Sequence, residues 1–102
     1  MAVAREIAKR SHDDKYKVGC IVVPDTNTGI LALGYNGNYP GGPHIRESDQ
    51  PGESGFMHAE LNCLLKLDFH SPYQKIMYVT LSPCIMCAKM ILACKITRVV
   101  YR

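Results

Sequence analysis

The fold is decided by residues 75–101, which read KIMYVTLSPCIMCAKMILACKITRVVY. The apolar run over 75–81, rich in strand-forming residues, predicts a buried strand. The Ser82-Pro83 pair supplies a favoured N-cap and a favoured first helical residue, so we expect a helix from there to about residue 93. A second apolar run over 96–101 predicts another strand. A strand, a helix and a strand in this order indicate a parallel crossover, the unit of an α/β sheet.

The segments further upstream extend the same sheet. Residues 18–23 and 30–35 are apolar runs separated by the turn-rich segment 24–29, which predicts a β-hairpin. Neither run alternates with polar residues, so we expect a sheet covered on both faces. Apolar residues at helical spacing predict helices over 2–11 and 57–67. The chain is therefore expected to be a layered α/β protein whose mixed sheet starts with a hairpin.

Length and composition narrow the class of protein. The chain has 102 residues, of which 47% are apolar and 21% charged, as expected for one globular domain spanning residues 1–102. The net charge of +3 comes without the Lys/Arg clustering of a nucleic-acid binder, and no apolar run is long enough for a membrane span. Five cysteines without a signal peptide favour a reducing compartment, so we expect a cytoplasmic protein.

Three side chains form a candidate zinc site. Cys84 and Cys87 are spaced i, i+3 at the start of a predicted helix, so both thiols point the same way, and a helix N-terminus lowers thiol pKa values. His58 lies at the start of the preceding helix. One histidine and two cysteines leave a fourth position for water, as in a catalytic zinc site. Glu60 follows two residues after His58, where its carboxylate can take a proton from that water and pass it to a substrate.

Other interpretations of these residue types remain open. A C-x-x-C pair is also found in redox proteins and in structural zinc sites, although this sequence has no second C-x-x-C and Ile85-Met86 is unlike common redox pairs. His12 and His70 are expected to be solvated. The methionines are expected to fill the core or an interface. The cysteines expected to be buried apolar residues are Cys20, Cys63 and Cys94.

Several segments together resemble a known family over nearly the whole chain. They are Val18 to Val23, Gly34-Tyr35-Asn36-Gly37, His58-Ala59-Glu60-Leu61-Asn62, Tyr78 to Cys84, Ala88 to Ile91 and Ile96 to Tyr101. A His-x-Glu followed by Pro-Cys-x-x-Cys is the signature of zinc-dependent deaminases of bases and nucleotides. The sequence resembles the cytidine and deoxycytidylate deaminase superfamily, and within it the deoxycytidylate (dCMP) branch. The resemblance implies a three-layer α-β-α fold of the cytidine deaminase type, here lacking the last helix and strand.

The resemblance also implies the chemistry of the site. His58, Cys84 and Cys87 would hold one catalytic Zn²⁺, and Glu60 would carry protons. The expected activity is that of a hydrolase acting on the C–N bond of a cyclic amidine, converting dCMP to dUMP and ammonia. Deamination of cytidine, of a free base, or of a base in tRNA or single-stranded DNA is an alternative, as is a non-catalytic zinc-binding module of the same fold.

The substrate contacts implied by the resemblance are spread along the chain. The backbone of Ala59 and Ser82 would hold the pyrimidine edge, and Asn36 would meet the sugar or the base. For the phosphate we rank His44 and Arg46 first among the available cations, because they follow the glycine-rich loop 37–42. The expected partner is a small pyrimidine nucleotide, with neither nucleic acid nor a membrane involved.

Two further expectations concern assembly and completeness. The apolar helix residues Ile85, Met86, Met90 and Ile91 and an uncovered last strand predict a homo-oligomer, and the resemblance implies a dimer or a hexamer. Relatives continue past the fourth strand. The chain is therefore expected to be either a fragment, truncated at one or both ends, or a minimal deaminase that gains the missing cover by oligomerising.

Overall fold

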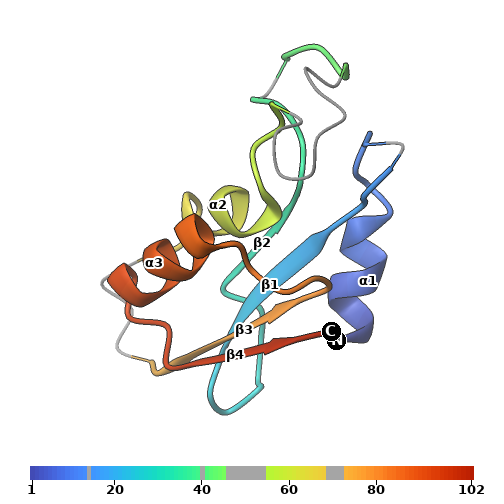
Figure 1. Cartoon of the computed structure of the whole chain (residues 1–102). Coiled ribbons are helices and arrows are strands. Elements are labelled where there is room, and N and C mark those ends of the chain that lie inside the picture. The colour runs from blue at the N-terminus through green and yellow to red at the C-terminus, as the bar shows by residue number, and fades with distance from the viewer. Residues whose placement is uncertain (14, 40, 46–54, 69–72) are drawn as a thin grey trace.

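The computed structural model describes residues 1–13, 15–39, 41–45, 55–68 and 73–102. Within them, a four-stranded sheet has helices on both sides (Figure 1). In chain order the elements are α1 (Ala2–Ala8), β1 (Gly19–Pro24), β2 (Ala32–Tyr35), α2 (Ala59–Leu64), β3 (Lys75–Val79), α3 (Ile85–Ala93) and β4 (Arg98–Tyr101).

The sheet has the strand order β2-β1-β3-β4. β1 pairs antiparallel with β2 and with β3, and β3 pairs parallel with β4. Both the predicted hairpin and the predicted parallel crossover are therefore confirmed. Cys20 of β1 lies opposite Gly34 on one side and Val79 on the other, so β1 is a central strand.

Helices cover both faces of the sheet, as its continuously apolar strands predict. Figure 1 shows α2 and α3 together on one side and α1 on the other. On β1, Cys20 and Val22 belong to the core cluster beneath α2 and α3, whereas Ile21 and Val23 pack with α1. Because successive side chains of a strand point to opposite faces, a strand covered on both faces must be apolar throughout. The expected layered α/β fold class is confirmed.

The helix after β3 begins later than predicted. Its N-cap is Cys84 and not Ser82, and Cys84 has an extended backbone with φ −70° and ψ 170°. The Cys84 sulfur accepts the backbone N–H of Cys87 at 3.4 Å, the bond that a capping serine side chain would accept. Pro83 therefore lies outside the helix, because a sulfur acceptor has taken the capping position that the sequence pattern assigned to Ser82.

The other two helices are shorter than predicted. α1 ends at Ala8, because the N–H of Ser11 donates to the Ala8 carbonyl at 3.0 Å and closes a tighter, 3₁₀-type turn. α2 occupies only the middle of the predicted range 57–67, and His58, with an extended backbone at ψ 152°, is its N-cap. Both changes bring polar residues that were predicted to be helical into the loops at the ends of the helices.

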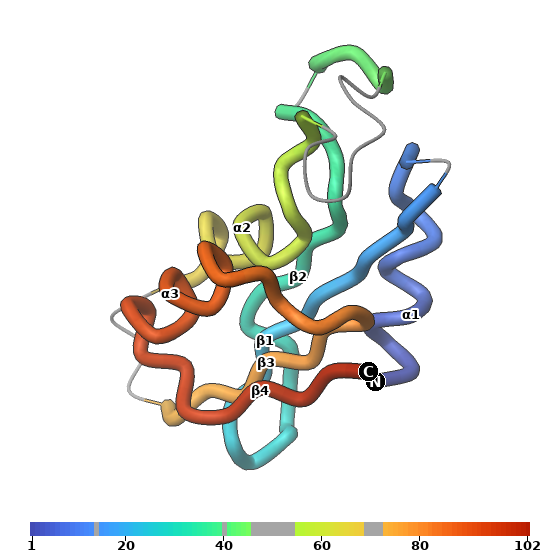
Figure 2. The backbone as a smooth tube through the Cα atoms, in the orientation of Figure 1, coloured from blue at the N-terminus to red at the C-terminus, as the bar shows by residue number. Residues whose placement is uncertain are grey.

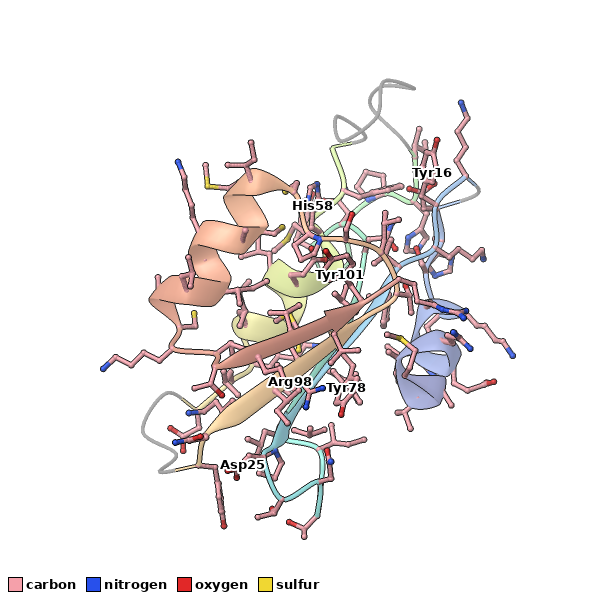
Figure 3. All side chains as sticks on the ribbon, turned by 60° about the horizontal axis from the view of Figure 1, so that its bottom comes forward. Tyr16, Asp25, His58, Tyr78, Arg98 and Tyr101 are labelled. Carbon is pink, nitrogen blue, oxygen red and sulfur yellow. The ribbon has the colours of Figure 1, made fainter. Side chains whose placement is uncertain are left out.

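β4 lies at one edge of the sheet and is its least buried strand. Arg98 and Tyr101 are exposed, and a groove of about 390 Å³ lies between β4 and α3. Figure 3 labels Arg98 close to Tyr78; the strand register puts both on the face of the sheet that α1 covers in part. β4 is thus an exposed edge strand, in agreement with the uncovered last strand predicted from the sequence.

The apolar face of α3 is divided between the core and the surface. Ile85 and Met86 are exposed, the former at 79%. Ile91 is instead buried in this chain's own core, and Met90 packs against that core. The expectation that all four residues face a second copy is therefore wrong for Ile91, because its side chain is buried in the core cluster that also contains Met77 and Val79 of β3. The oligomer itself stays a prediction.

The two ends of the chain lie side by side at one end of the sheet (Figure 2). Met1 and Val100 pack against the same cluster, which contains Ala4 and Ile21. Within the described residues, no helix is both long enough and apolar enough to cross a membrane.

Candidate metal centre

The three candidate ligands lie at the starts of two helices that pack on the same face of the sheet. His58 is the N-cap of α2, Cys84 is the N-cap of α3, and Cys87 is the third residue of α3. Because side chains at i and i+3 of a helical turn lie on one face, the two thiols point toward the same place. The first-turn N–H groups of both helices face this region and favour negatively charged ligands such as thiolates.

The distances between these side chains match a tetrahedral metal site. The Nδ1 atom of His58 lies 3.2 Å from the Cys87 sulfur and 3.5 Å from the Cys84 sulfur, and all three donor atoms lie within 4.8 Å of one another. Zinc bound tetrahedrally at its usual bond lengths separates a nitrogen and a sulfur ligand by about 3.6 Å. The residues present therefore fit zinc, through the Nδ1 atom of the imidazole.

The group has three protein donors, among the residues that the structure describes. Structural zinc sites normally have four protein ligands, whereas catalytic sites keep one position for water or substrate. Cys87 is 1% exposed, His58 is half-buried and Cys84 is exposed. The site is thus closed on the side of Cys87 and accessible on the side of Cys84, as a catalytic site must be.

Burial raises the pKa of the Cys87 thiol well above its ordinary value, and the nearby Glu60 carboxylate and Cys84 thiol raise it further. This differs from the sequence-based expectation that the helix N-terminus lowers the pKa of these thiols. Desolvation and a neighbouring negative charge outweigh the helix dipole at Cys87. A divalent cation offsets both effects, so zinc binding must displace the Cys87 proton.

Glu60 is a buried carboxylate beside the metal ligands. It is the second residue of α2 and is 5% exposed. Its negative charge is felt at Cys87, which places it near the ligand group. A buried carboxylate at a helix start is stabilised there by free N–H groups. Its predicted role as a proton carrier fits this position, and stays a prediction.

The predicted pyrimidine contacts flank the metal ligands. Ala59 is buried and directly follows His58, while Ser82 is exposed and lies two residues before Cys84. Their contact with the pyrimidine stays a prediction.

Asn36 lies elsewhere, just past the end of β2, and its side chain already has partners. Its Oδ1 accepts the N–H of Val18 at 2.9 Å, and its Nδ2 donates to the Tyr16 carbonyl at 2.7 Å and to Asp13 at 3.3 Å. Both amide protons are used by these bonds. Contact with a sugar or base stays a prediction, although only one lone pair of Oδ1 remains for it.

Of the two predicted phosphate contacts, only His44 lies within the described residues. His44 is exposed, and its ring stacks on that of His12 with centroids 3.8 Å apart and an interplanar angle of 24°. The solvated position expected for His12 is confirmed. Arg46 and His70 lie outside the described residues.

The remaining cysteines behave largely as expected. Cys20 and Cys63 are fully buried, and Cys94 is half-buried against the same core. A hydrogen bond with Cys63 and burial raise the pKa of the Cys20 thiol far above its ordinary value. The Cys20 thiol is therefore protonated and serves as an apolar packing group.

The structure also reveals polar residues for which the sequence predicted no role. Ser11 and Asp13 are 3% and 2% exposed. Their hydrogen bonds reach Asn36, which is 23 to 25 positions away in the sequence. The only sequence signal was a polar Ser-x-Asp segment at the end of a helix, which is equally typical of an ordinary helix stop.

α2 is held against β2 by a close backbone approach. A Cβ atom on Gly34 would lie 2.5 Å from the Cys63 nitrogen and 2.7 Å from the Ala59 carbonyl oxygen. We therefore expect Gly34→Ala to lower the free energy of unfolding by about 1–3 kcal/mol, because α2 must move away from the strand. Zinc retention should fall with it, since His58 moves together with α2.

Urea unfolding and zinc content per chain measure this effect. Gly29→Ala is the matched control, because a Cβ there meets no atom within 4 Å. Equal stability of the two variants would contradict the close packing of α2 on β2.

The fold and the three-donor group are those of an α/β domain with a candidate metal site. The entire chain, residues 1–102, matches the family described as the cytidine and deoxycytidylate deaminase zinc-binding region. The chain belongs to this family, and the resemblance stated from its motifs is confirmed.

Known relatives agree with this assignment. The deoxycytidylate deaminase of Mycobacterium phage D29 is 34% identical over 116 residues, covering 99% of this chain and 89% of that protein. The human deoxycytidylate deaminase is 34% identical over 110 residues, covering 99% of this chain but 61% of the human one. The chain thus spans most of the phage relative and about three-fifths of the human relative.

A solved structure shows the same fold. The dCMP deaminase of cyanophage S-TIM5, in complex with dCMP and dUMP, superposes with a TM-score of 0.77 at 31% identity. The match covers 99% of this chain and 76% of the cyanophage chain. The three-layer fold of the cytidine deaminase type is therefore confirmed.

Proposed function

We propose that this chain catalyses the zinc-dependent hydrolytic deamination of a cytosine nucleotide, with dCMP as the substrate and dUMP and ammonia as the products. The observation that carries the proposal is the buried Glu60 carboxylate beside a His/Cys/Cys group with an open fourth position. A purely structural metal site has no use for such a carboxylate. The proposal treats residues 1–102 as a single zinc-dependent deaminase domain.

His58, Cys84 and Cys87 would hold one zinc ion per chain. Zinc, when bound, lowers the pKa of a coordinated water to about 7 and so supplies a nucleophile at neutral pH. The starts of α2 and α3 hold the imidazole and the two thiols in place, and the burial of Cys87 keeps bulk water from that thiol.

Glu60 would move the protons that the reaction requires. Its carboxylate accepts a proton from the attacking water and delivers it to N3 of the pyrimidine. As the water oxygen bonds to C4, the double bond between C4 and N3 becomes a single bond and N3 takes up the proton. The second water proton then passes to the exocyclic nitrogen, and the bond from C4 to that nitrogen breaks as the C4 carbonyl forms. The balance is dCMP and water to dUMP and ammonia. A general acid–base group placed in this way contributes about 10²- to 10⁴-fold to the rate.

The backbone groups of Ala59 and Ser82 would orient the pyrimidine edge toward Glu60. Their closeness in the sequence to the ligands His58 and Cys84 supports this arrangement. His44 and Arg46 remain the proposed phosphate contacts, because they follow the glycine-rich loop and carry the required charge.

The choice of dCMP rests on the relatives. The matched phage and human proteins are named deoxycytidylate deaminases, and the cyanophage structure holds dCMP and dUMP. We propose the same substrate here, a cytoplasmic location and a homo-oligomeric assembly, either a dimer or a hexamer.

Ammonia release from dCMP, cytidine and dCTP tests the substrate assignment on protein loaded with one zinc per chain. We expect kcat/KM for dCMP to exceed that for cytidine by at least about 100-fold, because the binding free energy of two or more charge-assisted hydrogen bonds to phosphate corresponds to a ratio of that size. Cytidine turned over as well as dCMP would overturn the nucleotide assignment. Zinc-loaded protein that deaminates none of the three would overturn the proposed activity.

A further inference from the structure

Building on the proposed function, we propose that Ser11, Asp13 and Asn36 form a buried polar clamp that positions His58 and Glu60. In this proposal the side-chain bonds of Asn36 act through the backbone of the site, in addition to its predicted contact with the sugar or the base. Ser11 and Asp13 are positioning residues.

The clamp begins where the sheet ends. The last residue pair of the β1–β2 ladder is Gly19 with Tyr35, and one more backbone bond follows it, from the Asn36 N–H to the Val18 carbonyl at 3.2 Å. The Asn36 side chain adds to this pairing through the bonds to Val18, Tyr16 and Asp13 described above. Backbone groups at the end of a strand are thus satisfied by a side chain in place of a neighbouring strand.

Ser11 and Asp13 hold the other side of the clamp. The Ser11 hydroxyl donates to the Asn36 carbonyl at 2.8 Å and accepts the Asp13 N–H at 3.1 Å. The Asp13 carboxylate accepts the N–H of Lys15 at 2.9 Å and that of Tyr16 at 3.3 Å. Asn36 is 8% exposed, and burying polar groups at this depth is costly unless each finds partners, so the bonds specify one geometry.

The clamp is connected to the metal ligands through two backbone segments. Asn36 is followed by Gly37, whose N–H donates to the Met57 carbonyl at 3.0 Å and whose carbonyl accepts the Met57 N–H at 2.8 Å. Met57 directly precedes His58. On the other side, the Asn62 amide donates to the Tyr35 carbonyl at 2.9 Å and so fixes α2, which contains Glu60.

The position of the clamp in the molecule agrees with this role. In Figure 3, Tyr16 and His58 both lie at the end of the molecule opposite the hairpin turn that contains Asp25. A shift of Asn36 moves Gly37 and Met57 with it, because these residues are joined by a peptide bond and by a two-bond bridge. Misplacing a catalytic group by about 1 Å costs about 100-fold in rate.

Two readouts test the clamp in the zinc-loaded protein: the rate of zinc transfer to a chelator, and kcat and KM for dCMP. Ser11→Ala removes the hydroxyl that joins Asn36 to Asp13. We expect zinc transfer to accelerate by about tenfold and kcat to fall by about 10- to 100-fold, the range seen when a ligand's support is lost. KM should stay within about threefold, because no substrate contact is removed. Ser11→Thr, which keeps the hydroxyl, should restore both values.

Asp13→Asn provides a second variant with an unchanged shape. It keeps one oxygen for the N–H groups of Lys15 and Tyr16 but sets an amide donor against the Asn36 amide donor, so it should act like Ser11→Ala. The matched control is Thr97→Val, which removes another hydroxyl bond to a backbone carbonyl, that of Lys75 at 3.0 Å. Lys75 pairs with Pro24 beside the Asp25 turn, at the far end of the sheet.

The proposal is overturned if Ser11→Ala and Asp13→Asn release zinc at the wild-type rate, or if Thr97→Val accelerates release equally. A rise in KM at constant kcat in these variants also overturns it, because that result would make Ser11 and Asp13 substrate contacts and not positioning residues. If wild-type protein deaminates nothing, the proposed function fails, and the zinc-transfer rates still decide whether the clamp positions His58.

Discussion

Glu60→Gln is expected to lower kcat for dCMP by about 10²- to 10⁴-fold while the protein keeps one zinc per chain. Glutamine has the same shape as glutamate and can still form hydrogen bonds, but it cannot carry a proton between water and the pyrimidine. The buried position of Glu60 makes replacement by bulk buffer inefficient. Single-turnover ammonia release and zinc content per chain measure the two quantities separately.

Glu6→Gln is the matched control for this variant. Glu6 is an exposed glutamate of α1 that pairs with Lys9 at 2.9 Å, so its loss should change neither activity nor zinc content. Turnover in Glu60→Gln within threefold of the wild-type value would show that the carboxylate is not the proton carrier. Loss of zinc in Glu60→Gln would instead show that Glu60 supports the ligands.

Cys87→Ser is expected to weaken zinc binding by more than about 100-fold and to abolish turnover, since loss of a ligand costs at least as much as loss of the ligand's support. A serine hydroxyl fills nearly the same space as the thiol but does not ionise to a good zinc ligand at neutral pH. Excess zinc should then raise the Tm of the wild-type protein but not that of the variant, because a ligand stabilises only a fold that binds it.

Cys94→Ser serves as the control, since Cys94 is half-buried at the end of α3 and lies outside the ligand group. It should bind one zinc per chain with wild-type affinity. Metal content after dialysis and thermal unfolding with and without zinc provide the measurements. Stoichiometric zinc in Cys87→Ser would mean that the metal is held elsewhere.

The clamp and the metal site differ in how far the sequence could predict them. The i, i+3 spacing of Cys84 and Cys87 is local, so their convergence follows from helix geometry alone. His58 lies 29 positions before Cys87, so it was linked to the two cysteines by the chemistry of zinc ligands and by the family resemblance, and not by helix geometry. Asn36 was linked to the substrate by that same resemblance, whereas the structure places its side chain among Asp13, Tyr16 and Val18.

Local competition explains where the sequence patterns failed. Serine is a favoured N-cap residue, so the sequence predicted a helix start at Ser82. The Cys84 sulfur accepts the capping hydrogen bond instead, and the N-cap lies two residues after Ser82. The pKa of Cys87 was expected to fall at a helix N-terminus, yet burial and the charge of Glu60 raise it. Both outcomes depend on which groups lie near one another in the folded chain.

The sequence by itself determined the order of helices and strands, the mixed sheet and the pairing of Cys84 with Cys87. These properties follow from hydrophobic periodicity, turn residues and short spacings, which act over a few neighbouring positions. Only the tertiary structure decided the burial of Glu60, the pKa of Cys87 and the bonds from Ser11 and Asp13 to Asn36. Desolvation and long-range hydrogen bonds arise from the packing of distant segments, which no local pattern encodes.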